Sequence, residues 1–161
     1  MKFLSHGMGR AVLSLSLLAG ATAALAAAPQ TAPRDLAAEE RNRELVVTFY
    51  DRFFNKHEVA EAAKVVADDY IQHNPHVPDG KEPFVSFFTD LFKKNPEAKV
   101  KIVRSAVDRD LVYLHSHSTR GADDRGRAVV DIFRVKDGKI VEHWDVIQAV
   151  PEKAANDNTM F

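Results

Sequence analysis

The sequence predicts an α+β fold, in which three helices pack on a curved, mostly antiparallel sheet. Two observations support this prediction. Apolar residues recur at helical spacing in the first part of the chain, and after Pro96 the pattern changes to the alternation of strands. Helices followed by a run of strands are typical of α+β domains. One long sheet bent over three helices leaves a concave face, which favours a small-molecule pocket.

The first 26 residues have the pattern of a secretory signal peptide. Lys2 and Arg10 supply the positive start, an apolar run covers 11–25, and Ala24-Leu25-Ala26 offers a small-x-small cleavage site. We expect cleavage near Ala26 and a mature protein that is periplasmic or secreted, without membrane contact. A membrane anchor is the alternative, but the run is short and rich in alanine for that role.

The mature chain of about 135 residues has the size of one domain. Residues 27–34 are rich in proline and small residues, which predicts a linker before a domain over 35–151, and the polar segment 152–161 predicts a flexible tail. The formal net charge is -1, and loss of Lys2 and Arg10 makes it -3, which argues against a nucleic-acid partner. The chain has no cysteine, which excludes disulfides and thiol chemistry.

Three helices are predicted before Pro96. Asp35 is the expected N-cap of the first, which continues to about residue 55. The apolar face of this helix consists of Leu45, Val46, Phe49, Tyr50, Phe53 and Phe54. The second helix is expected over 58–67 and the third over 82–94, where the Asn95-Pro96 pair ends it.

Four strands are predicted after Pro96, at 100–106, 111–119, 127–135 and 139–150. Turn-forming residues separate neighbouring strands, at 108–110 and 136–138, and the segment 120–126 is a longer hairpin loop. A short edge strand is also expected at 70–73. These strands form the sheet on which the helices pack.

Asp131 is the most informative polar residue, because it interrupts an apolar strand. Alternation along strands places Asp131 on one face with Phe133, and His143 on one face with Asp145. A carboxyl group buried without a cation has a raised pKa and can act as an acid or donate a hydrogen bond. A structural aspartate paired with an arginine or with backbone amides is the alternative.

Histidines form the second polar signal. His115 and His117 share a strand face with Tyr113, and His73 lies in a polar stretch that ends at Pro75. Such side chains can bind a metal, line a pocket and shuttle protons, or simply be solvated. Because no second motif with metal-ligand spacing accompanies them, we expect no metal and no cofactor.

Three segments, in this order along the chain, resemble those of a known family: FYDRFFN, ADDYIQHNP and VVDIFRVKDGKIVEHWDVIQ. They resemble the SnoaL-like branch of the nuclear transport factor 2 superfamily over about residues 40–151, and the third segment is the most specific. The resemblance implies a cone-shaped α+β barrel with a deep pocket. It also implies dimerisation through the outer face of the sheet, so we expect a homodimer.

The resemblance further implies a chemistry. SnoaL-like polyketide cyclases close a ring by an aldol reaction with a pocket aspartate as acid and base, and the matching position is Asp131. Ketosteroid isomerase, a more distant relative, uses a tyrosine and a neutral aspartic acid as its oxyanion hole, which match Tyr50 and Asp131. The isomerase's general base matches Asn74, whose amide cannot accept a proton near neutral pH. His73 or a histidine of the sheet would then have to take that role.

Two functions follow from these observations. The first is an enzyme that moves a proton next to a carbonyl group (an aldol-type cyclase, lyase or isomerase) of a small hydrophobic molecule. Its expected catalytic residues are Asp131, His117, His73 and Tyr50, and its expected ligand contacts are Asn74, Tyr113, His115, Phe133, His143 and Asp145. The second function is a periplasmic binding protein that uses the same pocket without turnover, which an exported location favours.

Overall fold

A computed structural model describes residues 33–161, so the predicted signal peptide and nearly all of the predicted linker lie outside the described residues. The helices are α1 (Leu36–Tyr50), which continues in a π-helical turn (η1, Asp51–Asn55), α2 (Val59–Ala62), which continues in a 3-10 turn (η2, Ala63–Val65), and α3 (Lys81–Lys94). The strands are β1 (Val66–Gln72), β2 (Lys99–Asp108), β3 (Leu111–Thr119), β4 (Arg127–Lys136) and β5 (Lys139–Ala149).

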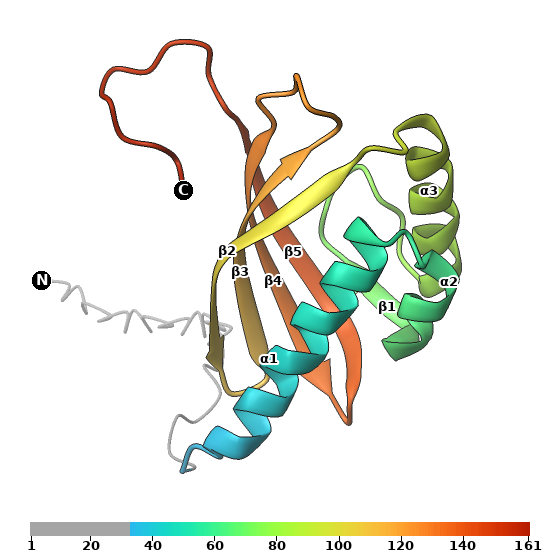
Figure 1. Cartoon of the computed structure of the whole chain (residues 1–161). Helices are drawn as coiled ribbons and strands as arrows, with labels where there is room; N and C mark the ends of the chain where they lie inside the picture. The colour runs from blue at the N-terminus through green and yellow to red at the C-terminus, as the bar shows by residue number, and fades with distance from the viewer. Residues whose placement is uncertain (1–32) are drawn as a thin grey trace, which may run out of the picture. The chain divides into compact units, whose positions relative to one another are not determined.

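The five strands form one mixed sheet in the order β1-β5-β4-β3-β2. β2 to β5 are antiparallel to their neighbours, and β1 runs parallel to β5. β1 and β2 form the two edges of this sheet, so it is curved but not closed into a barrel (Figure 1). The predicted α+β class, with three helices on a mostly antiparallel sheet, is confirmed.

The first helix lies across the concave face of the sheet, which we call the inner face (Figure 1). α1 packs on β2 and β3, while α3 packs on β1 and α2. The Asp35 side chain caps α1 by accepting a hydrogen bond from the Ala38 N–H at 2.9 Å, as expected for an N-cap. At the other end, the Asn55 side chain makes hydrogen bonds of 3.0 and 2.8 Å to the backbone of Val100 in β2. Both ends of the first helix are thus fixed.

The predicted second helix is wrong beyond its first turn. Instead of continuing to residue 67, the helix ends at Ala62, and the chain enters β1 at Val66 after one 3-10 turn. The expected edge strand therefore begins four residues earlier than predicted. β1 pairs with β5, where Gln72 lies opposite His143, and it buries Val66 and Tyr70. This long-range pairing overrides the local helical pattern.

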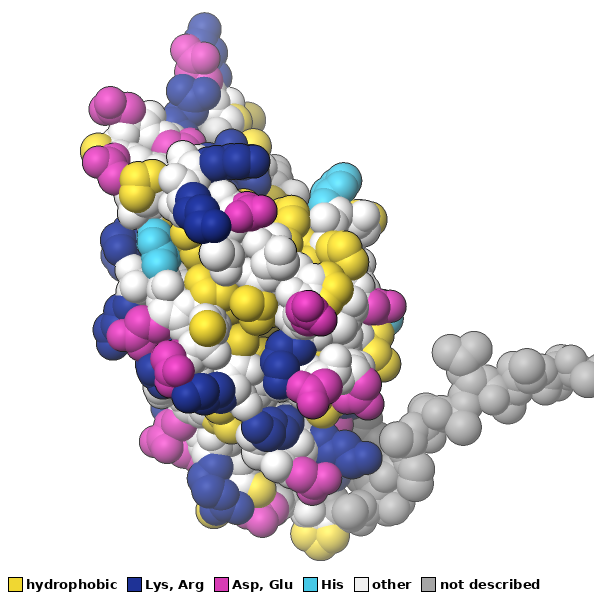
Figure 2. Space-filling model, turned by 90° about the vertical axis from the view of Figure 1, so that its right-hand side faces the viewer, with side chains coloured by type: hydrophobic (Ala, Val, Ile, Leu, Met, Phe, Trp, Pro, Cys, Tyr) yellow, Lys and Arg dark blue, Asp and Glu magenta, His cyan; other side chains and the backbone are white. Residues whose placement is uncertain are grey.

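Phenylalanine rings fill the space between α1, α3 and the sheet. Phe53 is fully buried and stacks on Phe84 with 4.8 Å between ring centroids. Phe88 and Phe92 of α3 contact the same ring, so the aromatic core extends along α3. On the side of the molecule that carries α3, hydrophobic side chains gather at the centre with charged ones around them (Figure 2). None of the helices within residues 33–161 combines the length and apolarity that a membrane crossing requires.

Candidate active site

A cavity of about 270 Å³ lies between the inner face of the sheet, Tyr50 and the aromatic side chains of α3. The side chains that point into it from β4 and β5 are those that alternation groups together: Val129, Asp131, Phe133, His143, Asp145 and Ile147. A larger but open depression of about 620 Å³ near β2 includes His117. We place the site in the enclosed cavity, because the buried Asp131 and His143 line it.

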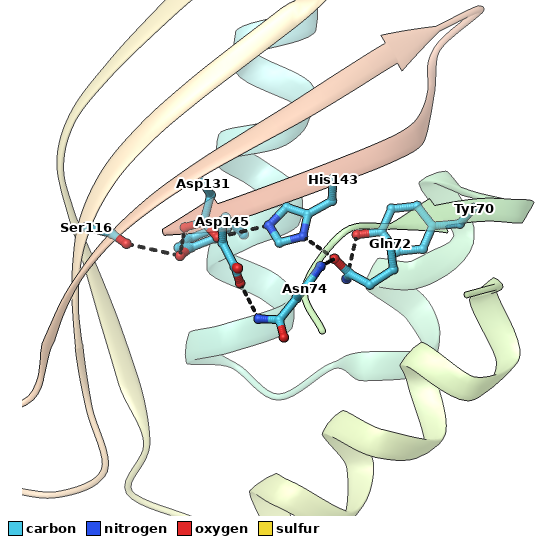
Figure 3. Close-up of polar contacts among 8 residues, drawn as sticks. Tyr70, Gln72, Asn74, Ser116, Asp131, His143 and Asp145 are labelled. Carbon is cyan, nitrogen blue, oxygen red and sulfur yellow. Dashed lines mark hydrogen bonds and ion pairs between the residues drawn. The ribbon is translucent and has the colours of Figure 1, made fainter. Parts of the chain in front are cut away.

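Asp131 is at the centre of a buried hydrogen-bond network (Figure 3). The Tyr50 hydroxyl donates to Asp131 Oδ2 at 2.7 Å, and His143 Nε2 lies 3.0 Å from Asp131 Oδ1. The Ser116 hydroxyl lies 3.1 Å from the Tyr50 oxygen. Because the one Tyr50 proton is used on Asp131, Ser116 donates to Tyr50. The carboxyl group of Asp131 thus adjoins the imidazole ring of His143.

Gln72 fixes the tautomer of His143. Gln72 Oε1 accepts a hydrogen bond from the backbone N–H of Asn74 at 2.9 Å, which settles the orientation of its side-chain amide. The same oxygen lies 2.8 Å from His143 Nδ1, so Nδ1 must carry a proton. The hydrogen bond between His143 Nε2 and Asp131 Oδ1 contains one proton, which lies either on His143 or on Asp131. The two side chains thus form a buried hydrogen-bonded pair.

Tyr50 stays protonated under all ordinary conditions. Burial raises its pKa well above 10.0, and the negative charge of Asp131 raises it further. Burial likewise raises the pKa of Tyr70, with Asp131 and Asp145 adding to the effect. A phenol that cannot ionise is a constant hydrogen-bond donor, so Tyr50 can donate either to Asp131 or to an oxygen of a bound ligand.

Asp145 and Asn74 form the outer part of the network. Asp145 lies directly opposite Asp131 in the β4–β5 pairing, and its Oδ2 accepts a hydrogen bond from Asn74 Nδ2 at 2.6 Å. Donor atoms of Asp131, His143 and Asp145 lie within 4.8 Å of one another and could hold a metal cation. In the arrangement described here, each of the three side chains has a hydrogen-bond partner in the protein.

Four of the sequence-predicted site residues lie away from this cavity. In the β3–β4 register, Leu114 lies opposite Asp131 and Ser116 opposite Val129, so the even-numbered residues of β3 face inward. The odd-numbered residues Tyr113, His115 and His117 therefore face outward, on what we call the outer face. A pocket role for these residues does not fit this register.

The outward-facing histidines have partners of their own. His115 Nδ1 accepts a hydrogen bond from Arg104, and His117 packs against the ring of Phe161 with 4.3 Å between centroids. His73 also lies on the outer face, where it contacts Glu142 at 2.9 Å and stacks on Trp144. His73 therefore cannot substitute for the base that Asn74 replaces. The histidine that adjoins Asp131 is His143, which we had expected only as a ligand contact.

Two functional residues were missed by sequence reasoning. The sequence predicts no role for Ser116, on the strand face opposite His115 and His117, or for Gln72, in the short edge strand expected at 70–73. Ser116 is fully buried, and Gln72 contacts both His143 and Tyr70. A polar residue two positions before Asn74 in an alternating strand was a usable signal, because residues 72 and 74 share a face.

The fold and this site define a class of proteins with a curved sheet, three helices and an aspartate-containing pocket between them. The sequence matches the family model of the SnoaL-like polyketide cyclases over residues 44–155, and the chain belongs to that family. The predicted resemblance is thus confirmed. A search of curated proteins found no significant match.

Solved structures support the same fold. A protein from Kribbella flavida, provisionally described as a ketosteroid isomerase, has a TM-score of 0.60 and 19% identity, covering 73% of this chain and 85% of that one. A SnoaL-like protein of unknown function from Burkholderia thailandensis has a TM-score of 0.60 and 15% identity, covering 69% and 97%. A protein from Mesorhizobium loti, of unknown function and similar to nuclear transport factor 2, has a TM-score of 0.59 and 23% identity, covering 73% and 98%. At these identities the likeness concerns the fold.

Proposed function

We propose that this protein transfers a proton at the carbon next to a carbonyl group of a small, partly hydrophobic molecule, as in an aldol-type cyclisation, lyase or isomerase reaction. The observation that carries the proposal is the buried Asp131–His143 pair, which is hydrogen-bonded at 3.0 Å and lines a cavity. Membership of the SnoaL-like family supports a cyclase or isomerase role.

The geometry supports a separate role for each group of residues in the reaction. The Asp131–His143 pair can accept a proton from the substrate carbon and return it elsewhere, because either partner can hold the proton. Tyr50 can donate a hydrogen bond to the carbonyl oxygen as negative charge develops there. Gln72 and Ser116 act as positioning residues, since they hold His143 and Tyr50 in place. The rings of α3 supply the apolar wall against which the substrate body packs.

Deuterium exchange tests the proposal without knowledge of the substrate. The protein is incubated in D₂O with aryl ketones such as 1-indanone, and the loss of the proton signal at the carbon next to the carbonyl is followed by NMR. We expect the wild type to accelerate exchange and Asp131→Asn and His143→Asn to lose about 100-fold of that acceleration.

His115→Asn is the matched control, because His115 lies on the outer face and its replacement should leave the exchange rate unchanged. If His143→Asn kept the wild-type rate, the pair would not be the acid and base. Equal exchange with and without the wild-type protein would contradict the proposed chemistry.

A binding role without turnover is the second candidate. It is favoured by the aromatic lining of the cavity and by the fact that no buried side-chain polar atom among residues 33–161 lacks a hydrogen-bond partner. A preformed, fully satisfied pocket can hold a ligand without chemistry. The same ketones would then raise the melting temperature of the protein and show no exchange above background.

We further propose that the mature protein is exported after cleavage near Ala26 and forms a homodimer through the outer face. The sequence pattern of residues 1–26 supports export. The outer face supports the dimer, because Val130 is 40% and Val146 70% exposed there. N-terminal sequencing of protein from the periplasm tests the cleavage. Sedimentation analysis of the wild type and Val146→Glu tests the dimer, which the added charge should weaken.

A further inference from the structure

The cavity is polar at its floor and cationic at its rim. Arg127 begins β4 and shares the inner face with Asp131, four residues further along the strand. At about 3.3 Å per residue, the two backbone positions are roughly 13 Å apart. Arg120 lines the same end of the cavity from the loop between β3 and β4. The stretch between floor and rim is apolar, because Val129 and the cross-strand Ile147 occupy it.

The two rim arginines have no carboxylate partner within residues 33–161. Several other arginines of the fold are paired, as Arg134 is with Asp110 and Glu142. Neither Arg120 nor Arg127 makes an ion pair or a side-chain hydrogen bond to any described residue. Their positive charge at the rim is therefore available to a ligand.

A carboxylate close to these arginines, that of Asp124, is hydrogen-bonded to the backbone. Asp124 accepts hydrogen bonds from the backbone N–H groups of Arg120 and Gly126, both at 2.9 Å. These contacts lower the pKa of Asp124, and the charges of Arg120 and Arg127 contribute less. Asp124 thus shapes the loop that presents the arginines and leaves their guanidinium groups unpaired.

We infer that the cavity binds an anionic carbonyl compound, with its carbonyl end at Asp131 and a carboxylate or similar group held at the rim by Arg127 and Arg120. This inference rests on the proposed function, because it assigns the other end of the same site. A neutral molecule would leave the rim charges unused. A molecule with its anionic group next to the carbonyl would bring that charge to Asp131 and Asp145, which line the floor.

Binding of two matched ligands tests the inference independently of any reaction. The probes are 5-oxo-5-phenylpentanoate and its methyl ester, which have the same carbonyl and nearly the same length but differ in charge. Calorimetry on the full mature chain should show the acid binding about tenfold more tightly than the ester at low salt. The preference should shrink as salt is added, because the arginines are exposed.

Arginine variants in and next to the loop between β3 and β4 make the test specific. Arg127→Gln and Arg120→Gln should each reduce the preference for the acid, whereas Arg125→Gln removes the same charge from a side chain that does not line the cavity and should leave it unchanged. Equal affinity of acid and ester, or binding of neither, would overturn the inference, as would an equal loss in Arg125→Gln. Asp131→Asn should retain the preference, so a failure of the proposed proton transfer remains distinguishable.

Discussion

The Tyr50 hydroxyl, at the end of α1, donates a 2.7 Å hydrogen bond to Asp131 in β4, although the two residues are 81 positions apart in the chain. This contact joins the first helix to the middle of the sheet. It therefore belongs both to the packing of the fold and to the chemistry of the site. The polar network can be tested for each role separately.

Removing the Tyr50 hydroxyl should destabilise the fold. In Tyr50→Phe, Asp131 and Ser116 both lose a buried partner, and we expect the free energy of unfolding to fall by about 1–3 kcal/mol. Urea denaturation measures the change. Tyr113→Phe, on the outer face, removes the same atom from a half-buried ring and should change stability by less than about 0.5 kcal/mol. Similar losses in the two variants would contradict a special role for the buried hydroxyl.

The tautomer of His143 can be observed directly. Long-range ¹H–¹⁵N NMR of the wild type should show a protonated Nδ1, because Gln72 Oε1 accepts from it. Gln72→Leu removes that acceptor and should abolish the preference, and it should also shift the pH profile of proton exchange. Gln148→Leu, an exposed substitution on β5, serves as the control and should leave the His143 signals in place. A wild-type spectrum with an unprotonated Nδ1 would refute the assignment.

The outer face should make the protein sensitive to acid through Glu142. Burial alone would raise the pKa of Glu142, but hydrogen bonds from Arg134 and His73 outweigh it and lower the pKa below its ordinary value of 4.5. Because the folded state holds the ionised form, this stabilisation is present above about pH 4.5 and is lost as the pH falls through the lowered pKa.

Thermal or urea unfolding of Glu142→Gln should show this pH dependence of stability. At pH 7 the variant should be less stable than the wild type by about 1 kcal/mol, and the difference should shrink as the pH falls through the lowered pKa of Glu142. Glu152→Gln, in the exposed tail, should match the wild type across the same pH range. A difference for Glu142→Gln that stays constant with pH would mean that its carboxylate charge is not what stabilises the fold.

Two glycines with similar φ angles allow the cost of backbone strain to be distinguished from the cost of steric crowding. Gly126 (φ +75°) and Gly138 (φ +71°) both adopt a left-handed conformation. A Cβ at Gly138 would meet open space, so Gly138→Ala should cost about 1 kcal/mol from the backbone alone. A Cβ at Gly126 would lie 2.2 Å from the Ser118 carbonyl oxygen, so Gly126→Ala should cost about 3 kcal/mol or more. Equal melting temperatures of the two variants would show that the loop 120–126 shifts enough to relieve the clash at Gly126.

The fold was largely predictable from local patterns. The change from helical to alternating spacing placed α3 and the four antiparallel strands nearly at their final boundaries. The exception is β1, because its partner β5 lies about 70 residues further along the chain and a parallel pairing leaves no local signal. The apolar and small residues before Asp68 fit a helix as well as a strand. Only the distant partner decides between them.

The site residues were predictable where the alternation of side chains within one strand was enough to place them on the same face. Alternation groups Asp131 with Phe133 and His143 with Asp145, and the register joins the two groups. The inward face of β3 could not be read in this way, since it depends on how the loop 120–126 sets the register, and a shift of one residue exchanges the faces. His115 and His117 drew attention as a pair, whereas the residue of that strand that reaches the network is Ser116.

The stacking of Trp144 on His73 has a practical consequence for spectroscopy. Trp144 is the only tryptophan of the chain, and its ring lies on the outer face, 4.6 Å from the His73 ring and 5.5 Å from the Arg134 guanidinium carbon. Intrinsic fluorescence of this protein therefore reports on unfolding and on the outer face, including any partner that covers it. A ligand that enters the cavity on the opposite side of the sheet leaves this fluorophore untouched, so titrations of the pocket need another signal.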